Sequence, residues 1–307
     1  MALNANMRAA LFMTLSMSGF VINDSFIRTV GDTMNPGQIM FLRGIIMAIF
    51  LGAFMGIKRT PLHLDKLVSL PMALRILGEA VGAVLFLMAL NHMPFANISA
   101  ILQALPLAVT AGAALFLGEH VGWRRLVAIV VGLAGVLLII RPGSEGFNGY
   151  ALLILATVVF AAIRDLATRK LDPTLPTLTV TLATTIAISV LGFLLAVVLG
   201  GFASADRGEL AMLASASIFL FVGYQALTIA MRTGEIAAVA PFRYTSLLWA
   251  IGIGIVAFGE IPDLPMLAGA AIVVATGIYT LYRERKVARR AAAANLSAVS
   301  PPPGRGT

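Results

Sequence analysis

The sequence predicts an all-α integral membrane protein with ten transmembrane helices in two inverted five-helix repeats. The first observation is composition: 59% of the 307 residues are hydrophobic and only 12% are charged, whereas charged residues make up about a quarter of a typical soluble protein. The second is a series of apolar runs along almost the whole chain. The third is a match of the sequence to itself.

The apolar runs number ten, and each approaches the roughly 20 residues that cross a hydrocarbon core about 30 Å thick. In order they cover residues 7–27, 36–57, 71–90, 95–117, 126–140, 149–167, 175–199, 210–231, 236–258 and 264–281. The first run has a short positive start but no small-residue cleavage site, and it contains Asn23 and Asp24. We therefore interpret it as a retained span and not as a signal peptide.

Basic residues between the runs predict the orientation. With the N-terminus in the cytoplasm, fifteen Lys or Arg residues fall in inner segments and three, namely Arg28, Arg141 and Arg207, in outer ones. This asymmetry follows the positive-inside rule and places both termini in the cytoplasm. Residues 283–307 are expected to form a basic, disordered cytoplasmic tail. The net charge of +8 thus reflects topology, and no nucleic-acid partner is expected.

An offset of 141 residues aligns the chain with itself. The match pairs Asp24 with Asp165, Arg28 with Arg169, and the "GE" that ends at Glu119 with the "GE" that ends at Glu260. The two copies, residues 7–140 and 149–282, hold five runs each. Because five is odd, the second copy enters the membrane from the opposite side, as in transporters built from inverted repeats.

These features resemble two copies of the EamA domain of the drug/metabolite transporter superfamily. The resemblance rests on the paired "GE", on "APFRY" in the ninth run, and on the glycine-bearing fifth and tenth runs "GLAGVLLIIRP" and "AGAAIVVATGIYTLY". It covers nearly the whole chain. The pieces "ND", "FLRG" and "APFRY...GEIPD" are similar to bacterial S-adenosylmethionine or riboflavin carriers, which implies transport of a bulky heterocyclic metabolite.

Charged residues inside the runs are the candidates for function. Each costs about 2.5–3.5 kcal/mol if it faces lipid, so we expect them to point inward and pair. There are seven of them: Asp24, Arg43, Arg75, Glu79, Arg164, Asp165 and Arg243.

Arg243 lies in "PFRY", where Pro241 removes a backbone hydrogen bond and predicts a weakened helix turn beside a cavity. Its planar guanidinium suits a carboxylate, a phosphate or a flat ring. We expect Arg243 and Tyr244 to contact substrate. In the alternative, Arg243 neutralises a buried acid such as Glu79 or Asp165.

Further residues are predicted to line the substrate site. Gln103 aligns with Tyr244 across the repeat, and Arg43 has Thr184 as its counterpart, an asymmetry that favours a functional role. Arg75 and Glu79 are four residues apart, on one helix face, where they either serve the site or satisfy one another.

Gating is expected at the two mouths of the pore. Asp24 with Arg28, and Asp165 with Arg169, are each one helical turn apart at opposite ends, with helix-end anchoring as the alternative. Glu119 and Glu260 are interpreted as capping or gating residues.

The function predicted is a secondary transporter in the bacterial inner membrane that moves a heterocyclic, anionic or zwitterionic metabolite by alternating access. Export of amino acids or drugs is the alternative, followed by an integral membrane enzyme or a channel. The chain has three His residues without HExxH spacing and no GxxxxGK[ST] motif, so neither an enzyme nor direct ATP coupling is favoured. Without cysteine, no thiolate metal site can form, and no cofactor is expected. The partners considered are the metabolite, membrane lipid and a second copy in a homodimer.

Overall fold

The structure is a computed structural model, and it describes residues 5–62, 64–118, 122–142, 148–233 and 239–299. Ten of its helical spans are long and apolar enough to cross a membrane, as predicted. The helices are α1 (Ala5–Val30), α2 (Pro36–Lys58), α3 (Leu70–Leu90), α4 (Phe95–Leu102), α5 (Leu105–Phe116), α6 (Trp123–Ile140), α7 (Tyr150–Thr168), α8 (Thr177–Val198), α9 (Arg207–Thr233), α11 (Thr245–Phe258) and α12 (Leu264–Val299), with 3-10 turns η1 (Leu64–Leu67) and η2 (Ala240–Tyr244).

Local sequence explains where several helices begin and end. The Asn35 side chain accepts a hydrogen bond from the backbone N–H of Gln38 and caps α2. Ser69 caps α3 by accepting from the N–H of Met72. Gly259, with φ of 66°, ends α11 in the left-handed conformation that favours glycine.

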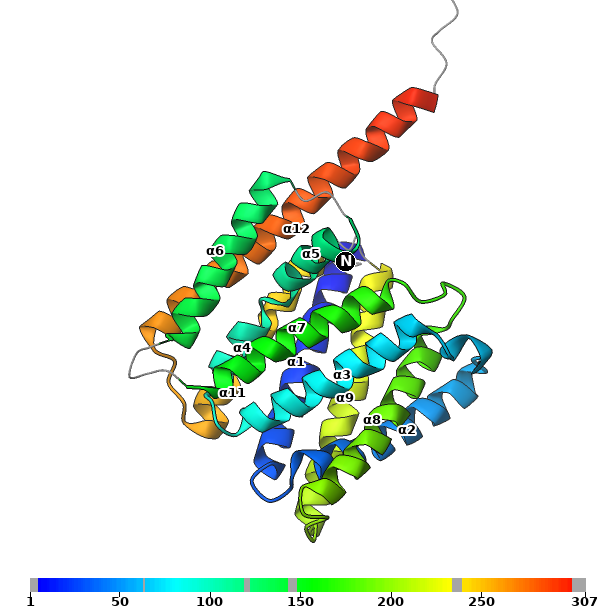
Figure 1. The fold of residues 1–307 in the computed structure, drawn as a ribbon, viewed down its shortest axis with the longest axis vertical. Coiled ribbons are helices and arrows are strands. Elements are labelled where there is room, and N and C mark those ends of the chain that lie inside the picture. The colour runs from blue at the N-terminus through cyan, green and yellow to red at the C-terminus, as the bar shows by residue number, and fades with distance from the viewer. Residues whose placement is uncertain (1–4, 63, 119–121, 143–147, 234–238, 300–307) are drawn as a thin grey trace, which may run out of the picture.

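Helix packing has the symmetry that an inverted repeat requires. The most extensive contacts are α1 with α9, α3 with α7, α2 with α8, and α6 with α12, and Figure 1 shows the last two pairs on opposite sides of the bundle. The 141-residue offset maps α1 onto α7 and α3 onto α9. The contact of α1 with α9 is therefore equivalent to the contact of α3 with α7. The other two pairs map onto themselves.

The same symmetry holds at single residues. A Cβ on Gly19 of α1 would lie 2.9 Å from the carbonyl oxygen of Phe219 on α9. A Cβ on Gly78 of α3 would lie 2.7 Å from the carbonyl oxygen of Phe160 on α7. The offset converts one contact into the other, so both halves use glycine to bring two helix backbones together.

Two spans are broken at equivalent positions. The fourth span consists of α4 and α5, separated by Gln103 and Ala104, and the ninth consists of η2 followed by α11. Pro106 stands in the first turn of α5, after the break in the fourth span, and Pro241 stands in the first turn of η2, before the junction with α11; neither can donate a backbone hydrogen bond. The weakened turn predicted at "PFRY" is the 3-10 turn η2, whereas the break in the fourth span was not predicted.

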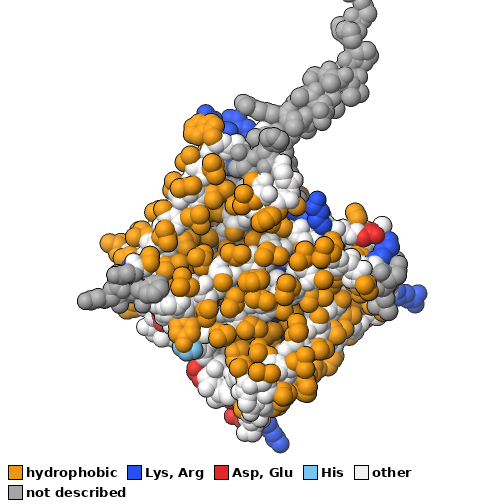
Figure 2. All heavy atoms as spheres, in the orientation of Figure 1, with side chains coloured by type: hydrophobic (Ala, Val, Ile, Leu, Met, Phe, Trp, Pro, Cys, Tyr) orange, Lys and Arg blue, Asp and Glu red, His pale blue; other side chains and the backbone are white. Residues whose placement is uncertain are grey.

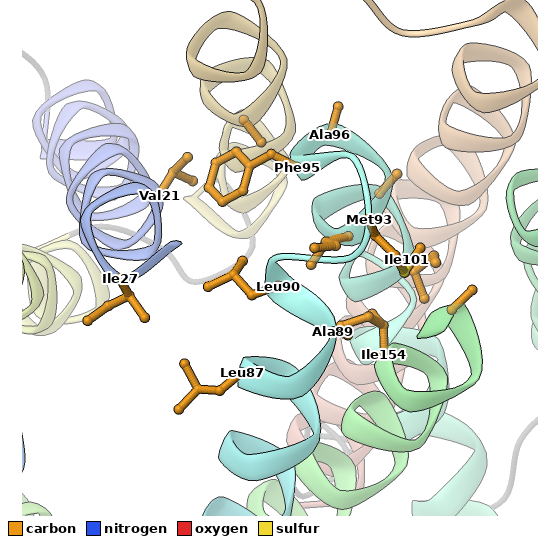
Figure 3. Close-up of a cluster of buried hydrophobic side chains, with 14 of the residues drawn as sticks. Val21, Ile27, Leu87, Ala89, Leu90, Met93, Phe95, Ala96, Ile101 and Ile154 are labelled. Carbon is orange, nitrogen blue, oxygen red and sulfur yellow. The ribbon is translucent and has the colours of Figure 1, made fainter. Parts of the chain in front are cut away.

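The lateral surface is apolar and the core is continuous across both halves. Figure 2 shows hydrophobic side chains over the face of the bundle, with charged ones at its margins, as a surface facing lipid requires. Figure 3 shows part of the buried cluster, in which Phe95 at the start of α4 points toward Val21 on α1.

The C-terminal segment, expected to be disordered over residues 283–307, is helical as far as Val299, and residues 300–307 lie outside the described residues. Helix α12 continues without interruption from Leu264 to Val299 and projects beyond the bundle in Figure 1. The alanine-rich sequence after Arg290 has high helix propensity, which outweighs its low complexity.

Candidate functional site: a cavity between two broken helices

A cavity of about 180 Å³ lies where the two broken spans approach α1. Its lining is mainly apolar and includes the rings of Phe20, Phe86 and Phe95. The polar residues that line it are Asp24, Ser99, Gln103, Arg243 and Ser246. A larger groove of about 370 Å³ lies between α6 and α12, with Arg124 as the only charged residue among those that line it.

The breaks in the two spans are joined by hydrogen bonds. The Gln103 side-chain amide donates to the Ser246 hydroxyl at 2.7 Å, and that hydroxyl donates to the carbonyl oxygen of Arg243 at 3.0 Å. Gln103 closes α4, and Arg243 belongs to η2. The connection therefore holds the interrupted parts of the fourth and ninth spans together at the cavity wall.

Arg243 lines the cavity, whereas Tyr244 is not among the residues that line it. The Arg243 side chain is exposed and forms no ion pair with any described residue. The two acids proposed as its alternative partners, Glu79 and Asp165, both pair with Arg164. Tyr244 is buried, and its hydroxyl lies against Gly277 of α12 without a hydrogen-bond partner in the described chain.

Asp24 also lines the cavity, and its expected partner was wrong. One oxygen of its carboxylate accepts a hydrogen bond from the side-chain amide of Asn23 at 2.8 Å. Arg43 of α2 interacts with Asp24 electrostatically, yet the two form no ion pair within the described chain. Arg28, one turn further along α1, pairs with Glu260 instead of Asp24. The end of α11 brings Glu260 within reach of Arg28, so two opposite charges on one face of α1 take different partners.

Glu260 organises one end of the cavity. Its carboxylate pairs with the guanidinium of Arg28 at 2.5 Å and accepts a hydrogen bond from the backbone N–H of Phe95 at 2.6 Å. The Arg28 guanidinium also lies 4.3 Å from the centre of the Phe258 ring. We refer to Arg28, Phe95, Phe258 and Glu260 as the Glu260 cluster. Phe95 is therefore both a wall of the cavity and a hydrogen-bond donor to Glu260.

A second polar region, the Arg164 cluster, lies between α3, α7 and α8. Arg164 pairs with Glu79 at 2.9 Å and with Asp165 at 2.8 Å. Arg75 donates to the hydroxyls of Thr168 and Thr184, so it does not pair with Glu79, four residues away. None of these residues is among those that line the cavity. The pairing of Asp165 with Arg169 stays a prediction, and Glu119 lies outside the described residues.

The known proteins that match this chain agree with the fold. The model of the EamA-like transporter family matches residues 7–141 and 148–283. The chain belongs to the EamA-like transporter family. A solved crystal structure covers 90% of the chain with a TM-score of 0.63 and 18% identity, which supports the same fold.

Relatives of this EamA family member are named as transporters of different small molecules. An S-adenosylmethionine uptake transporter of Rickettsia conorii is 26% identical over 90% of the chain and 93% of the relative. A riboflavin transporter of Rhizobium johnstonii is 27% identical over 71% of the chain and 72% of the relative. A pseudopaline exporter of Pseudomonas aeruginosa is 26% identical over 93% of the chain and 100% of the relative. The chain is thus a membrane transporter of a small metabolite.

Tyr224, Ser99 and Ser246 belong to the polar interior of this EamA transporter, and sequence reasoning missed them. Tyr224 of α9 interacts electrostatically with Arg43, Glu79 and Arg164, and its ring meets that of Phe20 at 5.2 Å. Its repeat counterpart is Ala83, so the repeat gave no signal. Ser246 follows "PFRY" by two residues, and that proximity was the available signal.

Proposed function

We propose that the chain is a secondary carrier that moves a small metabolite across the bacterial inner membrane by alternating access, with both termini in the cytoplasm. The observation that carries the proposal is the cavity at the joined breaks of the fourth and ninth spans. Carriers with inverted repeats commonly bind substrate near the bilayer midplane, on discontinuous helices at the repeat interface.

The two ends of the cavity support alternating access. The Glu260 cluster holds Phe95 in the cavity wall, and we assign the closed end to this cluster and the open end to the exposed Arg243 side chain. In the orientation predicted from the basic residues, the closed end faces outward and the Arg243 end faces the cytoplasm. We therefore assign this conformation to the inward-open state. Opening of the Glu260 cluster would begin the transition to the outward-open state.

The substrate class proposed is a heterocyclic, anionic or zwitterionic metabolite of the riboflavin or S-adenosylmethionine type. Relatives named for these molecules cover most of the chain. The exposed guanidinium of Arg243 supplies planar donors to a carboxylate or a stacking surface to a flat ring.

Counterflow in proteoliposomes tests the proposal. Vesicles preloaded with riboflavin, S-adenosylmethionine or an aromatic amino acid should take up the same labelled compound saturably. Arg243→Lys should abolish most of the exchange, because an ammonium lacks planar bidentate and stacking geometry. Arg232→Lys, at an exposed position on α9, is the matched control. Linear flux without counterflow would indicate a channel, and wild-type exchange by Arg243→Lys would remove Arg243 from the site.

Export is the second candidate direction, since the pseudopaline exporter matches over its full length. Uptake by inside-out vesicles but not by right-side-out vesicles, under the same imposed ion gradient, would identify an exporter.

The orientation is tested separately with reporter fusions. A reporter after Lys286 should score as cytoplasmic and one inserted near Ser144, which lies outside the described residues, as external. The reverse pattern would place the Glu260 cluster on the cytoplasmic side.

A further inference from the structure

The charges that line the cavity are one acid and one base. Among the described residues that form its walls, Asp24 on α1 is the only acid and Arg243 on η2 the only base. Neither forms an ion pair in the described chain. The other intramembrane acids, Glu79 and Asp165, are both paired with Arg164. The cavity therefore presents a carboxyl group and a guanidinium, neither of which forms an ion pair in the described chain.

Asp24 retains acceptor capacity toward the cavity. An ionised carboxylate has about four lone-pair sites, and the structure gives Asp24 one hydrogen bond, from Asn23 at 2.8 Å. Arg43 reduces the negative potential at Asp24 but does not line the cavity. A cation that entered the cavity would thus find acceptor sites on Asp24.

The remaining polar groups in the wall are few and partly engaged. Gln103 and Ser246 bond to one another, and the cavity walls also carry Phe20, Phe86 and Phe95. A ligand with a single charge would satisfy only one of the two residues, because Asp24 and Arg243 carry opposite charges. A ligand with both charges and an apolar body satisfies both residues.

We propose, on the basis of the carrier function above, that Asp24 and Arg243 form a two-point site selecting a zwitterion. Asp24 binds the ammonium group, Arg243 binds the carboxylate, and the aromatic walls pack on an apolar or aromatic body. The cavity of about 180 Å³ is smaller than the roughly 300–1,000 Å³ of pockets for drug-sized ligands. The structure thus fits a compact zwitterion of amino-acid size better than a large heterocycle in this conformation.

The test uses probes that share one aromatic body and differ in charge. L-phenylalanine and 4-(aminomethyl)benzoate carry both charges at two spacings, 3-phenylpropanoate carries the carboxylate alone, and 2-phenylethylamine the ammonium alone. Thermal stabilisation of the purified protein and competition against counterflow are measured for each. At least one zwitterion should bind about tenfold or more tightly than either singly charged probe, since each loses one charged hydrogen-bonded contact.

Two variants then separate the charged contacts. Asp24→Asn should lose the preference for the zwitterion over 3-phenylpropanoate, and Arg243→Gln should lose the preference over 2-phenylethylamine. Because the readout is a ratio between probes, partial loss of folded protein does not alter it. Asp172→Asn, an acid-to-amide change in an exposed loop, should keep the wild-type ratios.

Distinct outcomes overturn the inference and the proposed function. If riboflavin exchanges saturably while neither zwitterion surpasses its singly charged relatives, transport stands and the two-point site is overturned. If both variants keep the wild-type ratios, the assignment of Asp24 and Arg243 is overturned. If no compound shows saturable counterflow, the carrier function fails together with the site that rests on it.

Discussion

The cavity and the Arg164 cluster both carry charges within the membrane-spanning region, but among the described residues the charges form ion pairs only in the Arg164 cluster. In the Arg164 cluster one guanidinium is shared by two carboxylates, Glu79 and Asp165. In the cavity, Asp24 and Arg243 face a common space without an ion pair in the described chain. Paired charges stabilise helix packing at the cost of their desolvation, whereas unpaired charges lining a space are available to a ligand.

This difference separates residues that the sequence groups together. Asp24 and Asp165 are counterparts under the 141-residue offset, and each precedes an arginine by one turn. Yet Asn23, the counterpart of Arg164, donates only an amide hydrogen bond to Asp24. The first repeat therefore keeps an available carboxylate at the position where the second repeat neutralises it.

The largest effect is expected from Arg164→Gln. It leaves Glu79 and Asp165 without their counterion, and removal of one partner from a buried pair costs roughly 3–5 kcal/mol. We expect a loss of about 3 kcal/mol, near the lower end, because 24% of the Arg164 side chain is exposed. The measurement is thermal unfolding in detergent.

Arg243→Gln is the matched control for that variant and should unfold near the wild-type temperature, since no described acid depends on Arg243. Adding Glu79→Gln and Asp165→Asn to Arg164→Gln should restore much of the lost stability. An equal loss from Arg243→Gln would contradict the division between paired and unpaired charges.

A smaller effect is expected at the Glu260 cluster. Glu260→Gln removes the charge that pairs with Arg28, while its amide oxygen can still accept from the N–H of Phe95. If the closed state lost about 1.4 kcal/mol of stability relative to the open state, the open population would rise about tenfold. Because the chain has no cysteine, Ser99→Cys at the cavity wall gives a single labelling site.

Labelling of that cysteine by an impermeant maleimide added outside should be faster with Glu260→Gln than without it. Asp263→Asn, which disrupts the ion pair with Arg141 in the same part of the chain, is the control and should leave the rate near that of Ser99→Cys alone. Equal rates for both variants would show that the Glu260 cluster does not govern access.

The smallest effect concerns a charge pair outside the membrane. Asp172 lies between α7 and α8, 3.1 Å from Lys66. The Thr174 hydroxyl and backbone N–H, together with Lys66, lower the pKa of Asp172 from 3.8 to about 2. A lowered pKa means that the ionised form stabilises the folded state above pH 3.8 and that this contribution is lost as the pH falls toward 2.

Asp172→Asn should therefore lower the unfolding temperature slightly at neutral pH, and the difference from wild type should disappear near pH 2. Because Asp172 is exposed, the change should be far smaller than for Arg164→Gln. A pH-independent difference would point to the Thr174 hydrogen bonds and not to the charge.

The sequence predicts the fold more completely than the site for a physical reason. Span length, apolar composition and the repeat are properties of continuous segments, so they can be counted along the chain. Pairing depends on how helices pack, which brings Arg28 to Glu260 across 232 positions. Arg75 and Glu79 share a helix face, but Thr168 and Thr184 on neighbouring helices compete for Arg75.

Proline in the ninth span predicted the turn that presents Arg243, because the missing N–H acts within one segment. The same reasoning did not extend to the break at Gln103, although Pro106 stands in the first turn of the helix that follows it. Tyr244 follows Arg243 directly, yet a 3-10 turn has three residues per turn, so neighbouring side chains point in different directions. Proximity in sequence therefore did not make both residues part of the cavity wall.

The matched glycine contacts, Gly19 with Phe219 and Gly78 with Phe160, have an energetic consequence. The 141-residue offset converts each of these two contacts into the other. A rearrangement that exchanges the roles of the two halves therefore replaces each contact with an equivalent one. We expect the two end states to differ by only a few kcal/mol for this reason. A gap of that size lets a small molecule shift the population between the states by its difference in affinity alone.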